Sequence, residues 1–153
     1  MRKIIIALCA AAICLSSCGT PDGEYKLTVC AVTDVHGRYF DSLYVAPQQT
    51  KSSLSRVSTY IKNARRENPD LILIDNGDHL QGDNAAYYFN YVDTISPHIY
   101  GEIADYLGYD AMVVGNHDIE AGHSVYDRLR SELKLPYLAA NTIVASGAGP
   151  YFD

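Results

Sequence analysis

The sequence lacks the features that would place it in several common classes of protein. It has no excess of basic residues, because 12 lysines and arginines stand against 18 aspartates and glutamates, for a formal net charge of −6. Nucleic-acid binders carry basic stripes, so we expect no nucleic-acid partner. There are no internal repeats and no low-complexity tracts. Apolar residues make up 48% of the chain, which is typical of a folded globular protein.

The chain also has no long apolar run at its start, where a membrane-spanning helix could begin. The run 4–14 follows two basic residues and is too short to cross a bilayer. The sequence LSSC at 15–18 resembles the lipobox of bacterial lipoproteins, in which cleavage precedes the cysteine and the cysteine is lipidated. This resemblance predicts a signal peptide over residues 1–17, a lipidated Cys18 and a flexible linker over residues 18–24. An ordinary secretory signal or a retained apolar start are the alternatives.

A multiply acylated Cys18 would anchor the protein to a membrane surface without spanning the membrane. The expected location is therefore the cell envelope of a bacterium, on the periplasmic or outer-surface side.

Cysteine is scarce outside this segment. Cys9 and Cys14 lie in the signal, so Cys30 is the one other cysteine of the mature chain. Its apolar neighbours predict a buried thiol in a strand, without a redox role.

From Tyr25 onward, apolar runs of strand length alternate with amphipathic helical stretches. The expected strands are Leu27–Thr33, Leu71–Asp75, Ala111–Val114 and Tyr137–Asn141. The expected helices are one with Leu54, Val57, Ile61 and Ala64 on one face, one over Asn84–Val92, one capped by Ser96 with Pro97 at its first position and ended by Gly108, and one over Ser124–Leu133. This alternation predicts an α/β fold with a mainly parallel sheet and flanking helices.

Two of these helices carry side chains whose placement can be predicted. The third helix should turn its apolar face, Ile99, Ile103, Tyr106 and Leu107, toward the core. The second helix is rich in aromatic residues, namely Tyr87, Tyr88, Phe89 and Tyr91. Aromatic side chains of this kind could stack on a nucleobase, but packing in the core or at an interface is the favoured interpretation.

Polar clusters follow the first three predicted strands at the points where those strands end. They are Asp34-Val35-His36-Gly37, Asn76-Gly77-Asp78 and Gly115-Asn116-His117-Asp118. In open α/β sheets the carboxyl ends of the strands form the usual ligand crevice. We therefore expect the three clusters to converge at one edge of the sheet, although each is about 40 residues from the next.

The residue types in these clusters suit a metal centre. Asp34 and His36 are two residues apart, so an extended backbone would point both side chains at one ion. The two oxygens of Asp78 could bridge two ions, and Asn116 offers a neutral amide oxygen. Such a mixture of ligands favours Mn, Fe or Zn over Ca, which prefers oxygen alone. Glycines that permit tight turns and close approach accompany the clusters at positions 37, 77, 82 and 115.

The three clusters resemble the calcineurin-like metallophosphoesterase family, whose pattern is D-x-H, then G-D, then G-N-H-D/E. The surrounding text (TDVHG, DNGDHLQGD, LGYDAMVVGNHD and AANTI) is more narrowly similar to the 5'-nucleotidase and 2',3'-cyclic phosphodiesterase branch. The resemblance implies that residues 25–153 form the first half of an αββα sandwich. It also implies two divalent metal ions, with Asp34 and His36 on the first, Asp78 bridging both, and Asn116 on the second.

The same resemblance gives His117 a catalytic role beside the phosphate, where it would stabilise charge or protonate the leaving oxygen. In the nucleotidase branch a carboxylate three residues later orients this histidine. Glu120 holds that position here and Asp118 the next-residue position, so either one is a candidate. For the remaining histidines, His79, His98 and His123, we expect surface or packing roles, and for Asn141 a structural hydrogen bond.

The family pattern continues with a later histidine and a G-H-x-H block, which do not occur before Asp153. We therefore expect a dinuclear centre completed by residues beyond this chain, and no activity from this fragment alone. The expected function is hydrolysis of phosphate esters, with nucleotides as substrates. A cyclic nucleotide phosphodiesterase or a nucleotide-sugar hydrolase is the alternative within enzymes. A surface lipoprotein module that binds a partner without catalysis is the alternative of another class.

Overall fold

The structure, a computed structural model, describes residues 23–42 and 52–152. Its centre is a parallel sheet in which four strands follow one another in chain order. The strands are β1 (Val29–Val32), β2 (Ile72–Asp75), β3 (Ala111–Val113) and β4 (Tyr137–Leu138). The predicted parallel sheet is therefore confirmed, with shorter strands than expected. The predicted signal peptide (1–17) and Cys18 lie outside the described residues.

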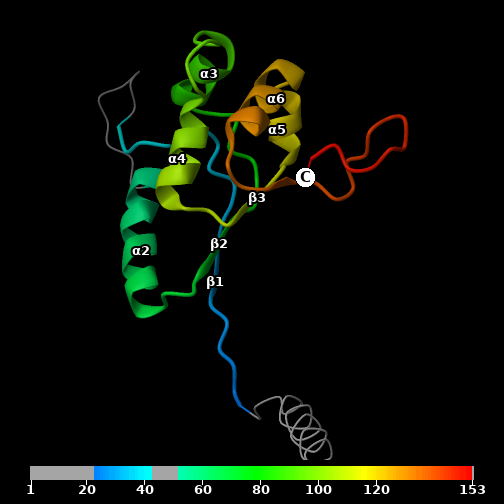
Figure 1. Cartoon of the computed structure of the whole chain (residues 1–153). Helices are drawn as coiled ribbons and strands as arrows, with labels where there is room; N and C mark the ends of the chain where they lie inside the picture. Colours follow the sequence, from blue (N-terminus) through cyan, green and yellow to red (C-terminus); the bar gives the residue numbers. More distant parts are fainter. Residues whose placement is uncertain (1–22, 43–51, 153) are drawn as a thin grey trace, which may run out of the picture.

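Helices flank the sheet and link its strands. They are α2 (Leu54–Glu67), α3 (Asn84–Tyr91), α4 (Ile99–Leu107), α5 (Asn116–Glu120) and α6 (His123–Glu132). In Figure 1, α2 and α4 lie side by side on one side of the strands, and α3 and α5 lie beyond the carboxyl ends of the strands. Arg65 of α2 joins the two neighbouring helices, because its guanidinium donates to the carbonyls of Leu107 and Gly108.

The core lies between the sheet and these helices. Leu73 and Met112 of the strands are fully buried, as are Ala104 of α4 and Leu129 of α6, and Ile61 of α2 is almost so. Removing such apolar surface from water is the main stabilising term of the fold. None of the described helices is both long enough and apolar enough to cross a membrane.

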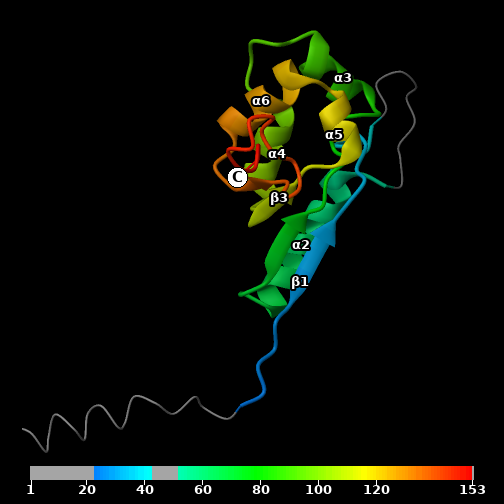
Figure 2. The same cartoon turned by 90° about the vertical axis from the view of Figure 1, so that its right-hand side faces the viewer.

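Strand β1 is not the buried strand that its apolar residues predict. It lies at the edge of the sheet, as Figure 2 shows. Val29 is 51% exposed and Ala31 is also exposed, because the described residues leave this face of β1 uncovered. Cys30 on the opposite face is half-buried, so the prediction of a buried thiol holds only in part.

Helix α4 begins later than the sequence predicts. His98, not Ser96, is its N-cap, and the imidazole Nδ1 accepts the backbone N–H of Tyr100 at 3.1 Å. Pro97 therefore precedes the helix. Gly108 ends the helix with φ +67°, as predicted. The buried face consists of Tyr100, Gly101, Ala104 and Leu107, so Tyr106, predicted to face the core, is exposed instead.

The aromatic residues of α3 do not pack in the core. Tyr87, Tyr88 and Tyr91 are each about half exposed or more, and only Phe89 among the four is half-buried. The core position of this helix belongs to Ala86 instead. Core packing is therefore wrong for the three tyrosines, and packing at an interface stays a prediction.

Candidate metal centre and catalytic residues

The loops after β1 and β2 run side by side beyond the sheet. The backbone N–H of Asp34 donates to the carbonyl of Gly77 at 3.1 Å, and that of His36 donates to the carbonyl of Asp78 at 2.9 Å. These bonds continue the contact between the two strands into the loops. The predicted polar clusters are thereby brought together at the carboxyl ends of adjacent strands, where open α/β sheets bind ligands.

Three predicted metal ligands have a left-handed backbone. The φ angles are +53° at Asp34, +48° at His36 and +59° at Asp78, and among the described residues these are the non-glycine positions with positive φ. The extended backbone predicted for Asp34 and His36 is therefore wrong. Their side chains nevertheless lie together, with His36 Nε2 3.8 Å from Asp34 Oδ1. Backbone strain of this kind gathers at functional sites.

Three side chains could hold one metal ion. One ligand atom each from His36, Asp78 and His117 lies within 4.8 Å of the other two. First-row ions bind nitrogen and oxygen at about 2.0–2.2 Å, so small rotations would bring these donors onto a common ion. The donor set suits Mn, Fe or Zn. The group includes His117, for which we predicted contact with the phosphate and no ligand role.

The other two predicted ligands flank this group. Asp34 lies beside His36, and the hydroxyl of Thr33 donates to its Oδ2. Asn116 is exposed at the first position of α5, next to His117. Within the described residues, Asp78 and Asn116 are the donors that we predict for the second ion, fewer than the four that such ions usually take.

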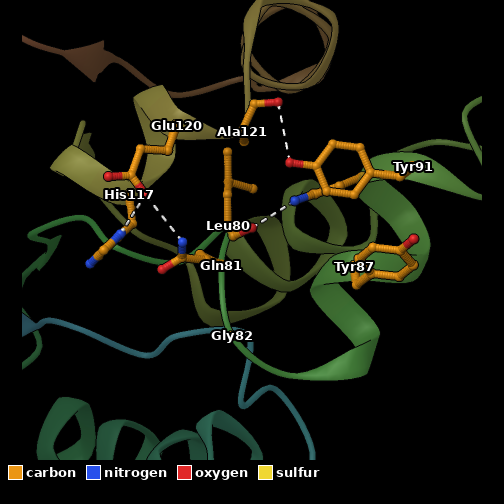
Figure 3. A pocket seen from close by; sticks show the side chains of 9 residues that line it. Leu80, Gln81, Gly82, Tyr87, Tyr91, His117, Glu120 and Ala121 are labelled. Carbon is orange, nitrogen blue, oxygen red and sulfur yellow. Dashed lines mark hydrogen bonds and ion pairs between the residues drawn. The ribbon is translucent and has the colours of Figure 1, made fainter.

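Glu120, and not Asp118, contacts the ring of His117. The Nδ1 atom of His117 lies 2.9 Å from Glu120 Oε2. This hydrogen bond and the negative charge of Glu120 raise the pKa of His117, against the opposing effect of partial desolvation. With Nδ1 bound in this way, Nε2 is left for the phosphate or for a metal. Figure 3 shows the pair beside Gln81.

Asp118 has a structural role instead, because its buried carboxylate accepts hydrogen bonds from backbone N–H groups near the site. Oδ2 accepts the backbone N–H groups of Asp78 at 2.9 Å and Gly115 at 2.8 Å. Oδ1 accepts those of His79 and Leu80, both at 2.9 Å. The bond to Gly115 also caps the start of α5. Asp118 thus fixes the loop that carries Asp78 against the start of α5, the helix that carries His117.

A buried polar cluster lies beneath this loop. His79 Nδ1 is 3.3 Å from Asp75 Oδ2 and 3.5 Å from Asp118 Oδ2, and the three side chains are fully buried. The His79 ring stacks on Tyr100 with 4.2 Å between centroids, and the Tyr100 hydroxyl donates to Asp75 at 2.6 Å. Burial raises the pKa of Asp75, while His79 and Tyr100 oppose that rise.

The surface or packing roles predicted for the remaining histidines agree with all three positions. His79 and His98 are both fully buried. Burial lowers the pKa of His98 to about 3. His123 is largely exposed at the start of α6, where its Nδ1 lies 3.1 Å from Asp127 Oδ2. Asn141 is exposed in the turn after β4.

Two glycines allow the loops to approach each other. A Cβ on Gly115 would overlap the carboxylate and the backbone nitrogen of Asp78. A Cβ on Gly82 would overlap the backbone carbonyl of His36. Both positions therefore require glycine for reasons of space, as the motif predicts.

A cavity of about 220 Å³ adjoins His117. Figure 3 shows side chains from α3 and from the segments around α5 facing each other across it. Its lining residues are Leu80, Gln81, Gly82, Tyr87, Asn90, Tyr91, His117, Glu120 and Ala121.

Sequence reasoning missed Gln81, Asp75 and the buried cluster. For Asp75 the available signal was a carboxylate at the end of the apolar run LILID, and for Asp118 it was the capping-box spacing from Gly115.

Known proteins with similar sequences act on nucleotides. The chain is 31% identical over 135 residues to the trifunctional nucleotide phosphoesterase protein YfkN of Bacillus subtilis, an alignment that covers 84% of this chain and 9% of YfkN. It is 32% identical over 123 residues to the 5'-nucleotidase of Bos taurus, covering 76% of this chain and 20% of that protein. For the 2',3'-cyclic-nucleotide 2'-phosphodiesterase/3'-nucleotidase of Yersinia enterocolitica the identity is 27% over 155 residues, covering 99% and 24%. The chain thus spans at most about a quarter of these relatives.

Comparison of folds agrees with the sequences. The crystal structure of the calcineurin-like phosphoesterase YfkN matches 82% of this chain with a TM-score of 0.75 and 28% identity, over 40% of that structure's own chain. The family model of the calcineurin-like phosphoesterases matches residues 27–151, which include all the predicted site residues except Cys18. The strands, the converging loops and these matches together lead to one assignment: the chain belongs to the calcineurin-like phosphoesterase family.

Proposed function

We propose that the protein that contains this chain hydrolyses phosphate esters of nucleotides, as a 5'-nucleotidase-like enzyme with two divalent ions of the Mn, Zn or Fe type. One observation carries the proposal. Donor atoms of His36, Asp78 and His117 gather within 4.8 Å at the ends of adjacent parallel strands, and Glu120 holds His117. The curated relatives, whose names describe nucleotide phosphoesterases, support the choice of substrate.

The metal ligands have distinct roles in this proposal. Asp34 and His36 would hold the first ion, Asp78 would supply a carboxylate oxygen to each of the two ions, and Asn116 would hold the second. The ions would polarise the phosphoryl group and activate the attacking water.

His117 acts on the phosphate through Nε2. Glu120 accepts a hydrogen bond from Nδ1–H and fixes the tautomer and the direction of the ring. A protonated ring could then donate from Nε2 to a phosphate oxygen or to the leaving oxygen. Asp118 joins the Asp78 loop to the start of α5, which carries His117.

A substrate assay on the complete gene product tests this function. Purified protein with added Mn²⁺ or Zn²⁺ should release phosphate from nucleoside 5'-monophosphates. Asp78→Asn should raise the activation barrier of hydrolysis by several kcal/mol, because it would weaken both ion sites. Preference for a 2',3'-cyclic nucleotide would favour the phosphodiesterase alternative, for which the Yersinia relative is the supporting observation. Activity near wild type in Asp78→Asn would refute the proposed centre. Absence of hydrolysis with any metal would favour the non-catalytic lipoprotein module.

We also propose that Cys18 anchors the protein at the bacterial cell envelope. The lipobox-like sequence LSSC at 15–18 supports this location. Metabolic labelling with a fatty-acid analogue should mark the protein, and Cys18→Ser should abolish the label. A label that survives the substitution would contradict the anchor. Cys30→Ser serves as the control and should keep the label.

A further inference from the structure

We propose that Gln81 is a positioning residue for His117 and acts through Glu120. The amide Nε2 of Gln81 donates to Glu120 Oε2 at 3.1 Å, and His117 Nδ1 lies 2.9 Å from the same oxygen. Figure 3 shows the three side chains in one continuous chain of hydrogen bonds at the wall of the cavity. This inference rests on the proposed function, because it assigns Gln81 a part in the chemistry of His117.

The backbone on either side of Gln81 is fixed. On one side, the Leu80 N–H donates to Asp118 Oδ1 at 2.9 Å, and the Leu80 carbonyl accepts from Asn90 Nδ2 at 2.6 Å. On the other side, Gly82 packs directly on the backbone of His36. The backbone of Gln81 is therefore held in a fixed position, although its side chain is exposed.

Glu120 needs a second partner because its position gives it freedom. It is the last residue of α5, and its side chain is 57% exposed. Holding a long exposed side chain in one rotamer costs conformational entropy. A donor on a fixed backbone restricts the carboxylate to the rotamer that meets His117. The donor is a neutral amide, so Glu120 keeps its full negative charge toward the imidazole, which a lysine or arginine would partly neutralise.

The consequence concerns the chemical step and leaves substrate binding unchanged. If Glu120 moves, the His117 ring loses its orientation, and Nε2 no longer meets the leaving oxygen. Proton donation matters most when the leaving group is a poor one. A nucleoside alkoxide needs the proton, whereas nitrophenolate leaves readily without it. Loss of Gln81 should therefore slow nucleotide hydrolysis more than nitrophenyl phosphate hydrolysis.

The test compares Gln81→Glu with Gln81→Ala in the complete protein. Glutamate keeps the shape but replaces the donor with a carboxylate that repels Glu120. Both variants should lower kcat for a nucleoside monophosphate by about tenfold, the scale of a lost outer-shell contact, with KM and metal content unchanged. The loss with nitrophenyl phosphate should be smaller. Asn84→Ala, an exposed amide at the start of α3, is the matched control and should leave both rates unchanged.

A double-mutant cycle decides whether Gln81 acts through Glu120. In a Glu120→Ala background, Gln81→Ala should cause no further loss. Ring ¹⁵N chemical shifts of His117 should move in Gln81→Glu and stay in place in Asn84→Ala. Equal losses in both backgrounds, equal losses for both leaving groups, or unchanged His117 shifts would each overturn the inference. If the wild type hydrolyses no phosphate ester, the proposed function fails, and the His117 shifts alone decide whether Gln81 positions the ring.

Discussion

The carboxylate of Asp118 accepts the backbone N–H of Asp78 at 2.9 Å, across 40 residues of sequence. Each oxygen of this carboxylate accepts two backbone N–H groups. Replacing one oxygen with an NH₂ group would therefore place its N–H donors against two backbone N–H donors. Asp118→Asn should lower the free energy of unfolding by about 2–4 kcal/mol, measured by urea denaturation. Glu102→Gln, an exposed acid on α4, is the control and should change it by less than about 0.5 kcal/mol. A stable Asp118→Asn would mean that the loops hold without this carboxylate.

A pair of glycine substitutions tests the close approach of the loops. Gly115→Ala places a methyl group on the carboxylate and backbone of Asp78, 2.7 Å from its Cγ, and should cost about 3 kcal/mol of stability or more. Among the described residues outside α4, the new methyl group of Gly101→Ala would meet Leu129 Cδ1 alone, at 3.6 Å. This substitution should stabilise the helix by up to about 1 kcal/mol. Thermal unfolding of the two variants measures the contrast. Equal effects of the two substitutions would contradict the loop packing.

Removal of the His117 side chain separates its two candidate roles. If His117 acts on the phosphate, His117→Ala should lower kcat by about 10²–10⁴, with metal content unchanged by elemental analysis. If the variant loses metal together with activity, His117 is a ligand, as its place among His36 and Asp78 would also allow.

Stability should depend on pH through His98. In the folded state its Nδ1 accepts a hydrogen bond from the Tyr100 N–H, and its pKa is about 3, below the ordinary value of 6.5. Between these two values the unfolded chain binds more protons, so the contribution of His98 is complete above about pH 6.5 and is lost as the pH falls toward 3. When the pH falls from 7 to 5, the free energy of unfolding of the wild type should decrease by about 2 kcal/mol more than that of His98→Gln. Urea denaturation at both pH values measures the difference. Equal losses would show that His98 is free to take up a proton in the folded state.

The sequence predicted the fold well because its pattern is local. Apolar runs such as 71–75 end in polar clusters, and that order alone places the clusters at one edge of a parallel sheet. The predicted start of α4 was wrong because its N-cap depends on contacts with residues that are distant in sequence. Glu132, 34 residues away, accepts the backbone N–H of His98 at 2.6 Å, and no pattern near Ser96 carries that information.

The sequence provided candidate residues for the site but only part of their geometry. Motif spacing located Asp34, His36 and Asp78, but not their left-handed backbone, which depends on bonds between the two loops. The choice between Asp118 and Glu120 also needed coordinates. Both carboxylates lie close to His117 in sequence, and only the direction of α5 turns Glu120 toward the ring and Asp118 into the protein.

The left-handed backbone at Asp34, His36 and Asp78 limits how this site can vary in evolution. Aspartate, asparagine and histidine tolerate this conformation better than most residues, whereas branched and bulky side chains do not. Glutamate and cysteine also bind divalent ions, yet at these positions they would bring backbone strain along with their ligand atom. The proposed coordination and the observed conformation thus favour the same few amino acids. A substitution that keeps a metal-binding atom can therefore still strain the backbone at these positions.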